Sequence, residues 1–128
     1  MFRLQFYRVG RQVLPTQTHS RKFLHYYAAE LGSVQINYTF RRFPETELME
    51  AALAEETPEA FRFSFKIHQH VTHMVRLNNV SDSVRGFMGA FRLLGPRLGV
   101  VLFQIPPHCK CNLERLYDFL GVLSPGHH

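Results

Sequence analysis

Three polar side chains stand where β-rich runs of the sequence end: Asn37, Lys66 and Gln104. Side chains alternate between the two faces of a strand, and in a βα fold the apolar face packs against helices. This parity places the three residues on the opposite face, at the strand ends where parallel α/β folds bind ligands. A lysine ammonium holds phosphate or carboxylate groups, whereas the two amides orient a ligand by hydrogen bonds. The pattern predicts a pocket that leans toward anions.

The same polarity has a purely structural explanation. Three strands alone leave this face in water, so polar side chains there reflect nothing more than exposure, and Lys66 is then an ordinary surface lysine. Tyr38, which follows Asn37, either stacks on a ligand ring or packs into the core. The sequence contains no phosphate-cradling glycine loop, no Gly-x-Ser-x-Gly elbow and no Cys/His nucleophile arrangement. Motifs therefore identify no catalytic residue.

Histidines and cysteines raise the question of a metal site. His68, His70 and His73 fall in one loop after the second predicted strand, and a His-x-His pair with a third histidine can bind a transition metal. No carboxylate or cysteine joins them locally, so we favour solvated histidines in a basic loop. Cys109 and Cys111 are one residue apart, where a disulfide would be strained. We expect two free thiols, no metal and no cofactor.

The elements that must position these residues follow from hydrophobic periodicity. Apolar side chains at three- and four-residue steps predict helices over 21–31, 44–55, 82–94 and 113–122, with Ser20, Ser81 and Asn112 as N-caps. β-Rich runs predict strands over 34–37, 61–66 and 100–105. Their helix-facing side chains are Val34, Ile36, Phe61, Phe63, Phe65, Val101, Phe103 and Ile105. The opposite face is predicted to be polar in all three strands, and the alternation predicts an α/β fold with a parallel sheet.

Composition sets the remaining bounds. The 128 residues are 45% hydrophobic and 20% charged, as expected for one globular domain with its own core. No apolar run reaches the ~18 residues of a membrane span. The N-terminus lacks an export signal, so a cytoplasmic protein is predicted. The net charge of +5 admits a nucleic-acid partner, although the positive residues are spread along the chain, which equally fits a surface rich in arginine.

Four stretches of the sequence resemble a known family. Residues 34–44, VQINYTFRRFP, resemble its V-E-I-N-x-T-F-Y-R-x-P segment, and residues 56–66, ETPEAFRFSFK, resemble its T-P-x-x-F-x-F-x-x-K segment. Thr72-His73 fits the T-H that follows, and residues 98–107, LGVVLFQIPP, resemble L-G-x-x-L-x-Q-x-P-P. Because these stretches occur in the right order, the chain resembles the YecE-like family, also called domain of unknown function 72.

The resemblance implies a β/α barrel of unsettled function, with a strand-end pocket lined by Asn37, Tyr38, Lys66, His73 and Gln104. A full TIM-like barrel needs about 250 residues, so we expect this chain to be about the N-terminal half of one. The expected domains are a divergent or poorly ordered segment at 1–18, a partial barrel at 19–123 and a tail at 124–128. Residues 1–18 show no match to the glycine-rich first strand of the family, so we expect that strand to be lost or replaced. Gln35 replaces a usual Glu, which weakens an acid/base or metal role.

Three functions remain open on this evidence. The leading hypothesis is a truncated barrel that lacks catalytic activity on its own. The second is an enzyme or binding protein for a phosphate-bearing or nucleic-acid ligand when the barrel is complete. The third is a half-barrel that docks with a separately encoded half, or associates with itself, because three parallel strands leave two unpaired edges. No membrane partner is expected.

Overall fold

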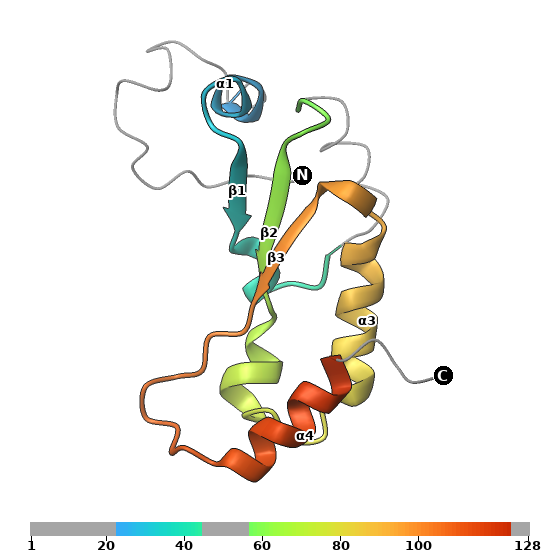
Figure 1. Cartoon of the computed structure of the whole chain (residues 1–128). Helices are drawn as coiled ribbons and strands as arrows, with labels where there is room; N and C mark the ends of the chain where they lie inside the picture. The colour runs from blue at the N-terminus through green and yellow to red at the C-terminus, as the bar shows by residue number, and fades with distance from the viewer. Residues whose placement is uncertain (1–22, 45–56, 124–128) are drawn as a thin grey trace.

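The computed structural model describes residues 23–44 and 57–123. In chain order the elements are α1 (Phe23–Glu30), β1 (Ser33–Ile36), η2 (Tyr38–Phe40), β2 (Arg62–Lys66), η3 (His70–Met74), α3 (Ser81–Arg92), η4 (Gly95–Arg97), β3 (Leu98–Leu102) and α4 (Leu113–Leu123). The strands form one parallel sheet in the order β1-β2-β3 (Figure 1). This confirms the α/β prediction. Ser20 and the predicted helix over 44–55, beyond its first residue, lie outside the described residues.

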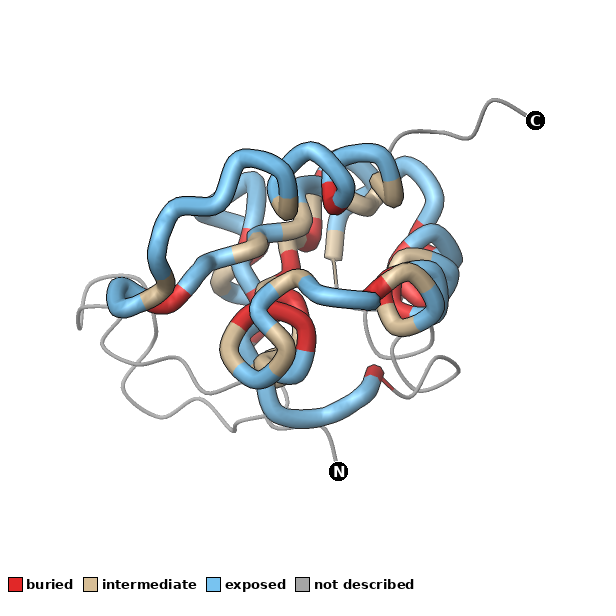
Figure 2. The backbone as a smooth tube through the Cα atoms, turned by 90° about the horizontal axis from the view of Figure 1, so that it is seen from below, coloured by how far each residue is buried: buried red, intermediate tan, exposed pale blue. Residues whose placement is uncertain are grey.

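The core is built on the apolar face of β2, the central strand. Phe61, Phe63, Phe65 and Ile67 are fully buried, which confirms the face predicted from their alternation with polar residues. Removing one such aromatic side chain from water is worth roughly 1.5–3 kcal/mol. Figure 2 shows the buried segments gathered inside the molecule, with exposed chain around them. The sheet therefore has one dry face, and its other face is left for the polar residues.

Each helix packs against this dry face through a few buried side chains. In α1, Leu24 and Ala28 are buried, and in α3 the stripe includes Val84, Phe87 and Phe91. The Phe91 ring stacks on Phe65 with centroids 4.5 Å apart. In α4 the buried anchor is Phe119, which meets Phe103 edge-on at 5.0 Å. These aromatic contacts between helix and sheet hold the strand ends in place.

A β-bulge interrupts the pairing of β2 with β3. Phe63 pairs with Leu98 and Phe65 pairs with Val101, so β3 has one more residue than β2 over this stretch. Two residues of β3, Gly99 and Val100, therefore lie opposite the single residue Ser64, whose hydroxyl oxygen accepts the Val100 N–H at 3.0 Å. A Cβ at Gly99 would lie only 2.7 Å from Ser64 Oγ and 3.3 Å from the Phe63 carbonyl oxygen. The bulge therefore requires a hydroxyl on one strand and a glycine on the other.

Two predictions about the third strand, its bounds and the polarity of its second face, are wrong. The strand spans Leu98–Leu102, not 100–105, and Ile105 is 37% exposed beyond its end. The second face is polar in β1 and β2 but not in β3, where Val100 is 66% exposed and Leu102 is 37% exposed. Leu102 pairs with Lys66, so the two side chains share that open face.

Two local predictions about helices also change. Ser81 is the first residue of α3, and Val80 occupies the N-cap position without a side-chain capping bond. The loop predicted after β2 contains a π-helical turn, η3, in which Val71 and Thr72 are fully buried. By contrast, Asn112 caps α4 as predicted, because its Oδ1 accepts the Arg115 N–H at 3.0 Å.

Candidate strand-end anion site

The three strands run in the same direction, so their carboxyl ends meet at one end of the molecule, toward α4 in Figure 1. Lys66 is the last residue of β2 and is half-buried. Asn37 follows β1 directly and is exposed. Gln104 lies beyond the end of β3 and is also exposed. Of these three strand-end residues, only the one on the central strand is half-buried.

An aromatic ring joins Lys66 to His73. The Lys66 Nζ lies 4.4 Å from the centroid of the Phe40 ring, within the range of a cation–π interaction. The His73 ring meets Phe40 edge-on, with centroids 5.1 Å apart and an interplanar angle of 83°. We call Phe40, Lys66 and His73 the Phe40 cluster. It brings together a lysine and a histidine that are seven positions apart in the sequence.

Thr39 fixes the backbone of this cluster. Its side chain is fully buried, and its hydroxyl donates to the Lys66 carbonyl oxygen at 2.7 Å. Arg62 donates its N–H to Gly32, so alternate residues of β2, including Lys66, turn their backbone polar groups toward β1. β1 ends at Ile36, and the Thr39 hydroxyl supplies the donor that a longer strand would have supplied. The bond ties η2, which carries Phe40, to the end of β2.

The π-helical turn η3 positions His73. The Thr72 hydroxyl lies 2.8 Å from His73 Nδ1, and Thr72 itself is fully buried. This contact occupies one ring nitrogen and fixes the plane of the imidazole. π-Turns within helical segments are frequent at functional sites, since the extra residue redirects side chains. Here the turn directs His73 against Phe40.

The other predicted residues stand apart from this cluster. Asn37 Oδ1 accepts a hydrogen bond from Gln35 Nε2 at 2.7 Å, so the residue that replaces the usual Glu now orients the asparagine. Tyr38 is half-buried and packs against the core, with the Arg42 guanidinium 5.7 Å from its ring centroid. The structure thus brings Lys66 and His73 together and leaves Gln104 at the surface.

Charge around Lys66 is uncompensated within the described ranges. The one ion pair found there joins Arg85 and Asp82 at 4.0 Å on the exposed face of α3. Lys66 instead faces the π-electrons of Phe40, an interaction worth about 0.5–1 kcal/mol at exposed sites and ~2 kcal/mol when desolvated. An ammonium held by a ring, and not by a carboxylate, keeps its full charge toward a ligand. The arrangement suits recognition of an anion.

Metal ligands do not converge in the part of the chain that is described. No group of three or more His, Cys, Asp or Glu side chains there is close enough to hold an ion. His68 stacks on Phe87 with centroids 5.6 Å apart, and its Nδ1 accepts the His70 N–H at 3.1 Å. Cys109 and Cys111 are free thiols, as predicted. The His68 side chain thus packs on α3 and accepts a local hydrogen bond.

Phe40 and Thr39 are the residues of this candidate site that the sequence did not predict. Both belong to the 34–44 stretch, directly after the candidates Asn37 and Tyr38. The Thr-Phe pair itself was the available signal, because it lies directly beyond a strand end. A threonine there can donate to a backbone carbonyl that has lost its strand partner, and an aromatic residue can line a pocket.

The geometry thus defines a parallel α/β protein with a lysine at the end of its central strand. The family described as "Protein of unknown function DUF72" matches residues 5–128, and the chain belongs to that family. The chain is similar to the UPF0759 protein YecE of Escherichia coli K12, at 32% identity over 101 residues, and to the UPF0759 protein YunF of Bacillus subtilis 168, at 31% identity over 110 residues. No solved structure gives a significant match.

The chain is much shorter than these relatives. The matches cover 78% and 81% of this chain but only 36% of YecE and 39% of YunF. Among the described residues, no helix is both long and apolar enough to cross a membrane.

Proposed function

We propose that this chain forms one wall of an anion-binding pocket in a β/α barrel, with Lys66 as the cation that meets the ligand. The observation that carries the proposal is the Phe40 cluster. It holds a half-buried ammonium 4.4 Å from an aromatic centroid, at the carboxyl end of the central strand, with no carboxylate partner among the described residues. His73 provides a second polar group against the same ring. The proposed ligand carries a phosphate group.

The three described strands do not close a barrel, since TIM-like barrels have eight. The relatives are more than twice as long as this chain, which supports a larger sheet that continues beyond these strands. On this proposal the chain alone binds weakly and catalyses no reaction, because the wall opposite Lys66 comes from further polypeptide. A cytoplasmic setting remains a prediction.

Phosphate binding by the chain itself tests this function. We would titrate the chain with inorganic pyrophosphate at low salt and follow backbone amide shifts by NMR. The expected shifts centre on Phe40, Lys66 and His73, and Lys66→Met weakens binding about tenfold, the equivalent of 1.4 kcal/mol. Lys110→Met is the matched control, because Lys110 is an exposed lysine in the loop before α4. Equal effects of the two substitutions would reduce the binding to general charge and overturn the proposal.

A nucleic-acid ligand is the alternative form of the same site. The chain's charge of +5 favours it, and phosphate contacts make affinity fall with salt. Each lost contact with duplex DNA lowers the slope of log affinity against log salt by about 0.9. Oligonucleotide binding whose salt slope drops by about one in Lys66→Met would support nucleic acid. A slope that the substitution leaves unchanged would exclude Lys66 from any such contact.

A second candidate function is docking with another barrel part. Tyr117 and Leu113 on α4 are 79% and 67% exposed, and Val100 and Leu102 are exposed on the open face of β3. Exposed apolar groups on a helix and on the neighbouring edge of a sheet are typical of a surface that a partner covers. Sedimentation of the chain, alone and mixed with the unmatched part of YecE, tests this. A monomer that binds no such partner would count against docking.

A further inference from the structure

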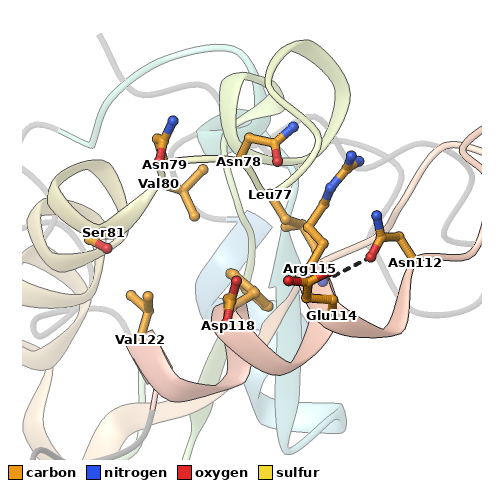
Figure 3. Close-up of a pocket in the computed structure, with 11 residues that line it drawn as sticks. Leu77, Asn78, Asn79, Val80, Ser81, Asn112, Glu114, Arg115, Asp118 and Val122 are labelled. Atoms are coloured by element: carbon orange, nitrogen blue, oxygen red, sulfur yellow. Dashed lines mark hydrogen bonds between the residues drawn. The ribbon is translucent and has the colours of Figure 1, made fainter.

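A pocket of about 390 Å³ lies between α4 and the segment that joins η3 to α3 (Figure 3). Its volume falls within the roughly 300–1,000 Å³ typical of small-molecule sites. None of the five residues predicted for the strand-end site lines it, and neither does Phe40. The pocket is therefore separate from the Phe40 cluster, and its chemistry has to be derived from its own walls.

One wall of the pocket is apolar and belongs to the core. Val80 and Phe119 are almost completely buried, and Val122 packs against them from the next turn of α4. Phe119 is held from behind by its edge-on contact with Phe103, at 5.0 Å between centroids. Because these side chains are fixed by core packing, the wall is preformed. It suits an aliphatic group.

The other walls carry charges of both signs: Arg115 is the cation, and Glu114 and Asp118 are two exposed carboxylates. Arg115 and Asp118 are three residues apart on α4, a spacing that often gives an ion pair, yet no such pair forms between them. Arg115 turns toward the opposite loop and donates from Nη1 to the Arg76 carbonyl oxygen at 3.4 Å. Figure 3 shows Arg115 rising from α4 toward the loop that carries Asn78, while Asp118 lies nearer Val122. The guanidinium keeps further donors for a ligand.

The loop over the pocket is held in an uncommon conformation. Arg76, Leu77 and Asn79 have φ values of 49°, 66° and 47°, in the left-handed region that non-glycine residues rarely occupy. Such residues cost on the order of 1–3 kcal/mol each and persist where the surroundings fix them, often at ligand sites. This conformation brings the Arg76 carbonyl to Arg115. The bond holds the Arg115 side chain toward the loop.

We propose that this pocket binds a small zwitterion with an aliphatic side chain, of the kind found in free amino acids and dipeptides. The ligand's carboxylate meets Arg115, its ammonium meets Asp118, and its side chain lies on Val80, Phe119 and Val122. The three features of the pocket match the three parts of such a molecule. A simple anion would leave both Glu114 and Asp118 unpaired, and a simple cation would leave Arg115 unused.

The test uses the whole chain with L-leucine and L-leucyl-L-leucine, followed by amide NMR shifts. We expect shifts at Asn78, Asn79 and Asp118 for at least one of the two probes, and which probe binds more tightly distinguishes the amino acid from the dipeptide. N-Acetyl-L-leucine lacks the ammonium and L-leucinamide lacks the carboxylate. Each derivative is expected to bind about tenfold more weakly than L-leucine, or not at all, for the loss of one charge contact worth ~1.4 kcal/mol.

Variants separate this site from nonspecific binding. Arg115→Gln and Asp118→Asn are expected to weaken binding about tenfold, whereas Arg92→Gln, on the exposed surface of α3 and outside the pocket, leaves it unchanged. The derivatives probe the same charges without altering the protein, so a poorly folded variant does not blur the result. The proposal fails if neither probe shifts the pocket amides at about 10 mM, or if the derivatives bind as tightly as the parent compounds.

Discussion

The Thr39 hydroxyl offers the sharpest test of how the fold builds the Phe40 cluster. It donates to the Lys66 carbonyl at 2.7 Å, in a partly buried bond, at the point where β1 has ended and no backbone N–H takes that place. Thr39→Val keeps the side-chain shape but removes the donor. Thr39→Ser keeps the donor but removes a methyl group. The pair therefore separates hydrogen bonding from packing.

The expected magnitudes differ. A buried acceptor left without a partner costs about 1–3 kcal/mol, so Thr39→Val should lower the free energy of unfolding by ~2 kcal/mol. Loss of one buried methyl group costs about 0.8 kcal/mol by transfer, so Thr39→Ser should lower it by roughly 1 kcal/mol. With a urea m-value of about 2 kcal/mol/M, these changes move the unfolding midpoint by about 1 M and 0.5 M.

Urea unfolding followed by circular dichroism measures both midpoints, and pyrophosphate titration of each folded variant measures the consequence for the site. Thr39→Val should also weaken pyrophosphate binding, because Phe40 follows Thr39 directly and its ring contacts the Lys66 ammonium. If Thr39→Ser is the less stable of the two, packing and not the hydroxyl holds this junction. If both variants bind pyrophosphate like the unaltered chain, Thr39 does not position Lys66.

Three further substitutions test the backbone devices of the fold by urea unfolding. Gly99→Ala should destabilise the chain by about 1–3 kcal/mol through overpacking. The loss should be smaller in a Ser64→Ala background, because the nearest atom to the new Cβ is Ser64 Oγ at 2.7 Å. Equal losses in both backgrounds would refute the bulge geometry. Asn112→Ala should cost ~1 kcal/mol and Asn112→Asp much less, because aspartate also caps helices; equal midpoints for the two would contradict the capping role. Gly95→Ala should cost about 1–2 kcal/mol, because Gly95 has φ 55° and the space around it is open; an unchanged midpoint would show that the turn relaxes.

Local patterns were sufficient to predict the dry face of the sheet. The alternation of Phe61, Phe63 and Phe65 with polar residues requires no knowledge of distant contacts, and all three are buried. The third strand was misplaced because its apolar run hardly alternates, so periodicity could not mark where pairing begins. The bulge depends on a hydrogen bond between Ser64 and Val100, which are 36 positions apart. No short-range rule encodes that contact.

The candidate site was likewise predicted only in part from local sequence patterns. Strand parity placed Lys66 at a strand end on the open face, and the family segments indicated His73. That they share a ring depends on two short irregular turns: η2, which the bond from Thr39 ties to Lys66 27 positions away, and η3, where Thr72 contacts the neighbouring His73. The zwitterion pocket was missed entirely, because its walls lie in two segments that carry no motif. Its left-handed loop residues are not glycines, so the usual sequence signal for that conformation is absent.

The open face of the sheet relates the two proposed functions to each other. Across β2 it changes from polar to apolar, with Gln35 on β1 on one side of Ser64 and Leu102 on β3 beside Lys66. On the proposed function, a ligand phosphate at Lys66 would lie over β1 and β2, where the polar residues Gln35 and Ser64 are paired. Apolar side chains on β3 gain nothing from such a ligand, but burying them stabilises any polypeptide that packs there. The two proposed functions would therefore use different parts of this face, and a partner that covers β3 would enclose Lys66 without displacing its ligand.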